Sequence, residues 1–150
     1  MILREILHAK GRVVHTIGPR ATLADVVQKL VANNCGSLIV CDREGVDSRS
    51  QPMRMLGIIT ERDILKACAT HRAPLESIVV ADVMTADVVT GTMADSVEDT
   101  MGLMTDMRIR HLPIVENGEL MGLVSIGDVV KMQHNRLTME NHYLKSYLHG

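Results

Sequence analysis

Hydrophobic residues recur along this chain at helical and strand spacings, and the same succession occurs twice. Two stripes repeat at i, i+3, i+4, i+7 and i+8, the spacing that predicts a helix with one buried face. The first stripe comprises Leu23, Val26, Val27, Leu30 and Val31, and the second comprises Val97, Thr100, Met101, Met104 and Thr105. We therefore predict an amphipathic helix at each stripe.

A hydroxyl residue precedes each stripe, and an acid follows it three positions later. The two pairs are Thr22 with Asp25 and Ser96 with Asp99. At this spacing the side chain of each residue can accept a hydrogen bond from the backbone N–H of the other. The sequence thus predicts a capping box at the start of both helices.

Short β-branched runs follow both stripes, at 37–41 and 111–115, and each leads to a second apolar run. The connection is long and polar in the first half, from Asp42 to Arg54, and tight at 116–119 in the second. Apolar runs bounded by such turn residues predict two strands in each half.

The second strand of each half ends in nearly the same motif. Residues 57–63 and 122–128 both consist of Gly, three residues ending in a hydroxyl, two variable positions and Asp. Each motif closes a strand and opens a helix. Two copies in matching frames indicate a tandem repeat of helix, strand, strand and helix.

The chain has 150 residues, so each repeat has about 60, a size at which burial alone gives marginal stability. We therefore expect the two copies to pack together about a pseudo-two-fold axis, with facing sheets and two equivalent clefts. The chain contains 11 Met and no Trp or Phe, which predicts an aliphatic, Met-filled core.

Composition excludes several classes of function. A net charge of −2, without a basic stripe among aromatics, argues against nucleic-acid binding. Three Cys without CxxC spacing predict buried thiols in a reducing compartment, with Cys35 a small hydrophobe rather than a redox sensor. No run approaches the about 18 apolar residues that span a membrane, and no signal-peptide pattern is present, so we expect a cytoplasmic protein.

Seven His are present, but none forms HxxxH or pairs with Cys at finger spacing. We therefore predict no metal site. The sequence likewise offers no nucleophile–base pair and no phosphate loop, so we predict no enzymatic activity and no catalytic cofactor.

Together these features resemble the cystathionine-β-synthase-type (CBS) domain, present as a tandem pair over residues 10–133. The elements that carry the resemblance are 57–63, 122–128, the Asp82-Val83-Met84-Thr85 segment and the 110–115 segment. The resemblance implies an α/β (α+β) fold of two pseudo-symmetric β-α-β-β-α units packed sheet to sheet. Its parts are CBS domain 1 at 10–70, CBS domain 2 at 80–133 and a C-terminal helix at 134–150.

The resemblance also implies a ligand. CBS pairs form disc-like modules that bind AMP, ADP or ATP, and in some members S-adenosylmethionine or dinucleotides such as NAD(H). We therefore expect a stand-alone regulatory or energy-sensing protein that acts on an unknown target protein. The alternative is an interaction or redox-partner module whose clefts bind NAD(H), S-adenosylmethionine or nothing.

Asp63 and Asp128 each stand at a helix start, where a carboxylate can accept hydrogen bonds from the two hydroxyls of a ribose. The hydroxyls of Thr60 and Ser125 lie beside N–H groups that attract phosphate. In the alternative interpretation, the acids only complement the helix dipole and the hydroxyls only cap. Two matching copies, together with the resemblance, favour ribose binding.

In the family, each ribose Asp works with phosphate-binding residues of the opposite copy. The implied residues are Arg110 and His111, with Arg108 nearby, opposite Asp63, and the uncharged Gly36 and Ser37 opposite Asp128. A charge-assisted contact contributes about 1.5–3 kcal/mol, against about 1 for a neutral one. We therefore expect a tight site at Asp63 and a weaker one at Asp128. Arg62 either adds to phosphate binding or is a solvated helix-start arginine.

The family places adenine against the extended segment before each capping box, contributed by the opposite copy. The implied residues are Val88, Val89 and Thr90 for the first cleft, Val14, His15 and Thr16 for the second, and Pro113 and Ile114 as walls of the first. Ordinary strand packing is the alternative for Val88 and Val89. Gly57 and Gly122 are expected to let the backbone approach the flat ligand closely.

The C-terminal segment continues as a helix with Leu137, Asn141, Leu144 and Leu148 at heptad-like spacing. This helix either covers the module or clasps a second copy, because CBS pairs typically associate into a symmetric dimer. The apolar positions of residues 2–7 predict a short helix beside it. We therefore expect a homodimer.

Overall fold

A computed structural model describes residues 1–42 and 54–149 of the chain. The polar connection predicted from Asp42 to Arg54 therefore lies almost wholly outside the described residues. The helices are α1 Leu3–Lys10, α2 Leu23–Asn33, α3 Glu61–Thr70, α4 Val80–Val83, α5 Val97–Met107 and α6 Ile126–His149, with a 3-10 turn η1 at Leu75–Ser77. The strands are β1 Thr16–Ile17, β2 Ser37–Cys41, β3 Met55–Thr60, β4 His111–Glu116 and β5 Glu119–Ser125.

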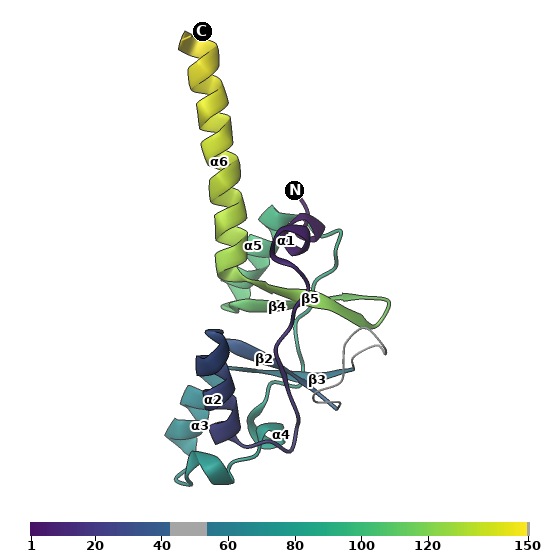
Figure 1. The fold of residues 1–150 in the computed structure, drawn as a ribbon, viewed down its shortest axis with the longest axis vertical. Coiled ribbons are helices and arrows are strands. Elements are labelled where there is room, and N and C mark those ends of the chain that lie inside the picture. Colours follow the sequence, from purple (N-terminus) through teal and green to yellow (C-terminus); the bar gives the residue numbers. More distant parts are fainter. Residues whose placement is uncertain (43–53, 150) are drawn as a thin grey trace. The chain divides into compact units, whose positions relative to one another are not determined.

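These elements form two compact units. The first-copy unit comprises Val13–Val89 together with 117–120, and the second-copy unit comprises Met1–Arg12, Thr90–Glu116 and the described residues from Met121 onward. Each unit combines a small sheet with helices, as Figure 1 shows. The predicted α/β class is confirmed.

The first-copy unit contains a three-stranded sheet in the order β1-β2-β3. β1 pairs with β2 in parallel, and β2 pairs with β3 antiparallel, with Leu38 opposite Ile59. α2 and α3 lie on the same face of this sheet (Figure 1). Because side chains alternate between the faces of a strand, Leu38, Val40 and Ile59 all point into the helix-covered core.

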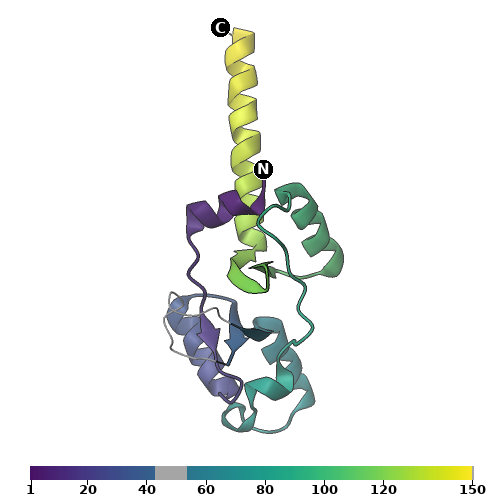
Figure 2. The ribbon, with the colours of Figure 1, turned by 90° about the vertical axis from the view of Figure 1, so that its right-hand side faces the viewer.

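The second-copy unit repeats this plan with a shorter sheet. β4 pairs with β5, and Gly91 forms a parallel bridge to Ile114, as β1 pairs with β2 in the first copy. α1 and α5 pack against the first part of α6, whereas the rest of α6 extends beyond them (Figure 2). The predicted packing of the N-terminal segment beside the C-terminal helix is thus confirmed.

The core of both units is aliphatic, as predicted, whereas the buried methionines among the described residues lie in the second-copy unit. Buried residues of the second-copy unit include Leu3, Leu112 and the two methionines Met93 and Met104. These soft side chains fill the space that an aromatic core would otherwise occupy.

The two predicted capping boxes differ. In α2, Thr22 N–H donates to Asp25 Oδ2 at 3.0 Å and Asp25 N–H donates to Thr22 Oγ1 at 3.2 Å, so the box is complete. In α5, Asp99 N–H donates to Ser96 Oγ at 3.0 Å, and this is the half of the box that forms. The prediction is confirmed for α2 and only in part for α5.

The cysteines depart from the expectation of buried thiols. Cys41 is buried in β2, Cys35 is half-buried and Cys68 is exposed. Ala67 is the buried position of α3, so the adjacent residue 68 points about 100° away, toward solvent. The prediction of three buried thiols was therefore wrong for Cys68.

Candidate functional site

The first candidate site is built at the junction of β3 and α3. Thr60 ends the strand and caps the helix: its N–H donates to Asp63 Oδ2 at 3.0 Å, and Asp63 N–H donates to Thr60 Oγ1 at 3.3 Å. The Thr60 hydroxyl also lies 3.2 Å from the same carboxylate oxygen. The capping interpretation of this motif is therefore confirmed, and ribose binding has to be compatible with it.

The second carboxylate oxygen of Asp63 has a different neighbour. Thr85 Oγ1 donates to Asp63 Oδ1 at 3.1 Å. Thr85 is held in place because its backbone bridges Ile58, with both N–H···O distances 2.9 Å. The hydrogen bonds that these groups give Asp63 thus come from hydroxyls and a backbone N–H, which carry no charge, and the side chain is half-buried.

The second candidate site repeats this geometry at the junction of β5 and α6. Ser125 N–H donates to Asp128 Oδ2 at 2.8 Å, and Asp128 N–H donates to Ser125 Oγ at 3.1 Å. In addition, Lys10 of α1 places its ammonium 2.6 Å from Asp128 Oδ2 and donates to the Leu123 carbonyl at 2.9 Å. A charged group therefore contacts Asp128 where a neutral hydroxyl contacts Asp63.

The electrostatics of Asp128 follow from these contacts. Burial raises the pKa of the Asp128 carboxyl. The hydrogen bonds from Lys10 and Ser125 and the charge of Lys10 lower this pKa by more than burial raises it, so it lies below the ordinary value of 3.8. The folded state thus holds Asp128 ionised and paired with a cation.

The two glycines of the repeated motif have a structural reason to be small. A Cβ on Gly57 would lie 2.6 Å from the Thr85 carbonyl oxygen, and one on Gly122 would lie 2.8 Å from Leu7 Cδ2. Each glycine therefore admits a neighbouring segment of its own unit. These contacts require a small residue at both positions without any ligand, and the close approach of a flat ligand stays a prediction.

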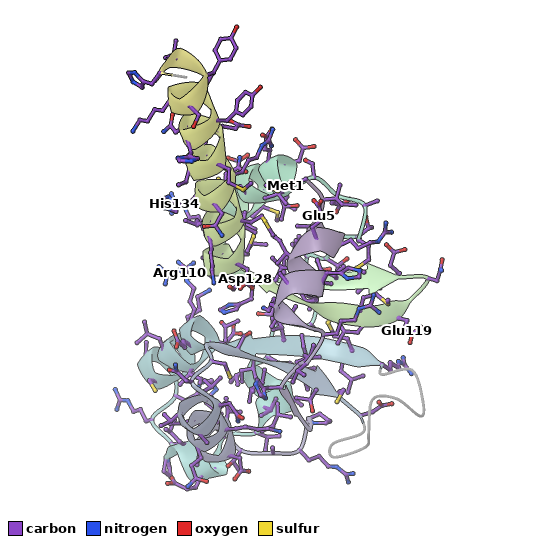
Figure 3. All side chains as sticks on the ribbon, turned by 45° about the horizontal axis from the view of Figure 1, so that its top comes forward. Met1, Glu5, Arg110, Glu119, Asp128 and His134 are labelled. Atoms are coloured by element: carbon purple, nitrogen blue, oxygen red, sulfur yellow. The ribbon has the colours of Figure 1, made fainter. Side chains whose placement is uncertain are left out.

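The predicted phosphate-binding positions match between the copies. Ile126 N–H donates to the Arg110 carbonyl at 2.8 Å, and Glu61 N–H donates to the Gly36 carbonyl at 3.1 Å. Arg110 directly precedes β4, and Gly36 directly precedes β2. Each thus contacts the start of a helix in its own copy. Arg110 and Asp128 both lie at the base of α6 in Figure 3. Arg110 is exposed, and His111 is half-buried at the first position of β4.

The remaining predicted site residues divide between the units. The first-copy unit contains Val14, His15, Gly36, Ser37, Thr60, Arg62, Asp63, Val88 and Val89. The second-copy unit contains Arg108, Arg110, His111, Pro113, Ser125 and Asp128. Val88 and Val89 thus share a unit with Asp63. Their contact with adenine stays a prediction.

Burial also separates site positions from core positions. Ser37 and Ile114 are 3% and 0% exposed, and Pro113 is buried in β4, so the Ile114 side chain belongs to the core rather than to a ligand wall. Arg62, Arg108 and Arg110 are exposed, and Val14, His15, Val88 and Val89 are half-buried. Half-buried and exposed groups are the ones that a ligand can reach.

Sequence reasoning missed the two residues that contact the carboxylates of Asp63 and Asp128, namely Thr85 and Lys10. Thr85 lies in a segment that carried the family resemblance, so its position was visible although its role was not. Lys10 left no signal, because it is separated from Asp128 by 118 positions and belongs to no repeated motif.

Two further properties concern the described residues only. Within 1–42 and 54–149, no group of three or more His, Cys, Asp and Glu side chains is placed to hold a metal ion. In the same ranges, no helix has the length and apolar character needed to cross a membrane.

The Lys10–Asp128 pair predicts a pH dependence. Because the pKa of Asp128 is lowered by folding, its contribution to stability is present above the ordinary pKa of 3.8 and is lost as the pH falls through the lower folded value. We expect Lys10→Met to lower the free energy of unfolding in urea at pH 7, and the deficit to shrink at pH values below 3.8.

Lys66→Met is the matched control, since Lys66 is exposed and forms none of the ion pairs among the described residues. Its effect is expected to be small and independent of pH over this range. A Lys10→Met deficit that is the same above and below the titration would contradict the ion-pair assignment.

Comparison with known proteins places these motifs in a family context. Residues 4–70 and 80–135 match the family described as the CBS domain. A CBS-domain-containing protein from Agrobacterium tumefaciens has a similar structure, with a TM-score of 0.78 and 38% identity over 89% of this chain and 99% of that one.

Other relatives extend this similarity. The mitochondrial CBS domain-containing protein CBSX3 of Arabidopsis thaliana is 34% identical over 131 residues, which are 86% of this chain and 61% of CBSX3. This chain thus spans less than two thirds of that relative. A CBS domain protein from Pyrobaculum aerophilum, whose structure is a complex with AMP, is 29% identical over 85% of this chain and 89% of that one, with a TM-score of 0.70.

Proposed function

Since this chain belongs to the family of CBS-domain proteins, we propose that it binds an adenine nucleotide and regulates a partner protein according to the ligand bound. The observation that carries this proposal is the Asp63 carboxylate, half-buried at a helix start and hydrogen-bonded by neutral groups. The AMP complex of the Pyrobaculum relative supports adenylate as the ligand class. The proposal includes no catalytic step.

In this proposal Asp63 accepts hydrogen bonds from the two hydroxyls of the ribose. A carboxylate offers about four acceptor positions, and the three hydrogen bonds from Thr60 and Thr85 leave acceptor capacity on Oδ1. The Thr85 hydroxyl is a rotor, so it can turn to accept from a ribose hydroxyl while still donating to Asp63. The cap and the ribose contact are therefore compatible.

The phosphates are assigned to Arg110 and His111, with Arg108 and Arg62 as further cations. This assignment rests on the family resemblance and on the equivalent positions of Arg110 and Gly36. The backbone carbonyl of each accepts a hydrogen bond from the first residue of a helix in its own copy. Gly36 and the buried Ser37 offer no positive charge at the equivalent place. The charged set therefore favours one nucleotide site over the other.

The contact of Lys10 adds a second reason to rank the sites. A ribose hydroxyl gains most from a carboxylate whose charge is not already compensated. Asp128 is paired with an ammonium at 2.6 Å, so its hydrogen bonds to a ligand would be weaker than those of Asp63. We therefore assign the tight site to Asp63 and the weak site to Asp128, Ser125, Val14 and His15.

Regulation requires that the ligand distinguish between conformations. A ligand shifts a conformational equilibrium only by its difference in affinity for the two states. A nucleotide that prefers one arrangement of the repeats would thus change the surface presented to a target. The target, the homodimer and the cytoplasmic location stay predictions from the sequence.

Thermal melts test the ligand class. A ligand at 100 times its Kd adds about 2.7 kcal/mol of stability, which we expect to raise the Tm by about 5–10 °C for a chain of this size. The panel comprises AMP, ADP, ATP, NAD(H) and S-adenosylmethionine, each at saturating concentration. Absence of a shift with every member of the panel would refute adenine-ligand binding.

A further inference from the structure

The free part of α6, residues 137–149, has no packing partner among the described residues of its own unit. From Leu137 to His149 every residue is exposed, whereas Val129, Met132, Gln133 and Arg136 lie buried or half-buried toward α1 and α5. Figure 2 shows this part of α6 extending beyond the other helices of the unit. Large apolar side chains are nevertheless present on it, namely Leu137, Met139, Tyr143, Leu144, Tyr147 and Leu148.

The composition of this segment makes the absence of a partner costly. Its residues include Thr138, Asn141, His142, Tyr143, Ser146 and Tyr147, all from the weaker half of the helix-propensity scale. Most helical stability in proteins comes from packing of an amphipathic face rather than from propensity. The free part of α6 continues the packed first part of the same helix, and a contact along its exposed apolar side chains would stabilise it further.

The apolar positions of α6 define a heptad seam. Val130, Leu137 and Leu144 recur every seven residues and occupy the d positions, and His134, Asn141 and Leu148 occupy the a positions. At 100° per residue the seam lies about 110° around the helix from the side that packs on the unit. Leu137 and Leu144 are accordingly 56% and 55% exposed, so the unit leaves the seam open.

A second register through the same leucines is less favourable. It would place Leu137 and Leu144 at a, and Gln133, Glu140 and Tyr147 at d. Glu140 is charged and is held by Arg136 at 3.2 Å, and Gln133 turns its Oε1 into the unit. Burying a carboxylate in the seam would cost several kcal/mol, so the register with Asn141 at a is the one that α6 supports.

We propose that α6 pairs in parallel with α6 of a second copy of this chain, as a two-stranded coiled coil. Leu137 and Leu144 at d supply apolar layers, and Asn141 is the kind of polar a residue that fixes the register and the number of strands in a coiled coil. Charge complementarity supports the same orientation: Glu140 at g faces Lys145 at e of the partner helix, an attractive pair formed twice in a parallel dimer. This inference goes beyond nucleotide binding and needs no ligand for its test.

Light scattering after size exclusion tests the proposal. We expect the wild-type chain to approach twice its 16.5 kDa mass as its concentration is raised through the micromolar range. Leu144→Glu is expected to halve that mass. Because Leu144 is exposed, its substitution should leave the thermal melt of the dilute protein unchanged.

Met139→Glu is the matched control. It makes the same change from an apolar side chain to a carboxylate on the same helix, at a residue that is 74% exposed. Met139 occupies the f position, which faces away from the seam. We expect it to remain dimeric. A monomeric wild type at every concentration, or equal losses from both variants, would overturn the proposal, as would a dimer that survives Leu144→Glu.

A cross-link tests the orientation. In a parallel pair each d residue faces its own copy, so Leu144→Cys in a Cys68→Ser background should form a disulfide-linked dimer on mild oxidation. Removal of the exposed Cys68 prevents linkage through the native surface thiol. Dimers in solution that do not cross-link at position 144 would overturn the parallel arrangement.

Discussion

Replacement of Asp63 by Ala is expected to weaken adenylate binding about 10- to 150-fold, because hydrogen bonds to a charged group contribute about 1.5–3 kcal/mol. The side chain lies at the start of α3, with one oxygen on the Thr60 cap and the other toward Thr85. Isothermal titration calorimetry with the nucleotide that gives the largest melting shift measures the change in Kd directly.

The control for this substitution has to separate ligand binding from capping. Asp25 occupies the same third position of a complete capping box in α2, with N–H···O distances of 3.0 and 3.2 Å. Asp25→Ala should therefore lower stability by the same mechanism, by about 0.3–1 kcal/mol, and leave the Kd unchanged. Equal losses of affinity in both variants would show that Asp63 acts only through helix stability.

The same titration ranks the two sites. Asp128→Ala is expected to leave binding of the first equivalent unchanged, since Asp128 is already compensated by Lys10 at 2.6 Å. Arg110→Ala is expected to weaken binding by a factor similar to that of Asp63→Ala, because a charge-assisted phosphate contact is lost. Loss of binding in Asp128→Ala, with binding preserved in Asp63→Ala, would reverse the ranking.

Substitution of Gly57 by Ala is expected to destabilise the fold by about 2–3 kcal/mol, at the upper end of the effects of overpacking. The added Cβ would lie 2.6 Å from the Thr85 carbonyl oxygen and 2.9 Å from Met84 Sδ. The carbonyl is backbone, fixed by the two 2.9 Å hydrogen bonds between Ile58 and Thr85, so it has little freedom to move away. Urea denaturation at pH 7 measures the loss.

Gly102→Ala supplies a control with the opposite sign. Gly102 lies within α5, and nothing comes within 4 Å of the position of its Cβ. Replacing glycine by alanine inside a helix stabilises it by up to about 1 kcal/mol. A destabilised Gly102→Ala, or a Gly57→Ala variant as stable as the wild type, would contradict the assigned contacts.

The Gly57 variant also bears on the nucleotide site. Thr85 contacts both Gly57, through its carbonyl, and Asp63, through its hydroxyl. A shift of this segment should therefore weaken ligand binding even where the chain still folds. The segment 84–85 thus links the stability of the first-copy unit to the geometry of the proposed ribose contact.

Local structure was predictable because its causes are local. The i, i+3, i+4 spacing predicted α2 and α5, and a hydroxyl followed by an acid predicted the caps at Thr22 and Ser96. The duplicated order of helix, strand, strand and helix followed from the same short-range patterns, whereas the leading strand of each unit was implied by the resemblance to CBS domains. Within the capping motifs, the incomplete box at Ser96 shows that spacing permits a hydrogen bond without ensuring it.

The contacts of the repeated glycines could not be predicted in this way. A small residue at Gly57 fits a nearby ligand or a neighbouring protein segment, and only the tertiary structure shows the Thr85 carbonyl oxygen 2.6 Å from where a Cβ would lie. Likewise, the side on which an extended segment packs depends on contacts that the sequence of the segment does not contain.

By itself, the sequence determined the duplicated unit, its caps and strands, and the pair of carboxylates at equivalent helix starts, because each depends on interactions within a few residues. Only the tertiary structure decided how those carboxylates differ. It brings Lys10 to Asp128 across 118 positions and a hydroxyl to Asp63 across 22. Contacts between residues so distant in the chain depend on how the helices pack, and no local pattern encodes them.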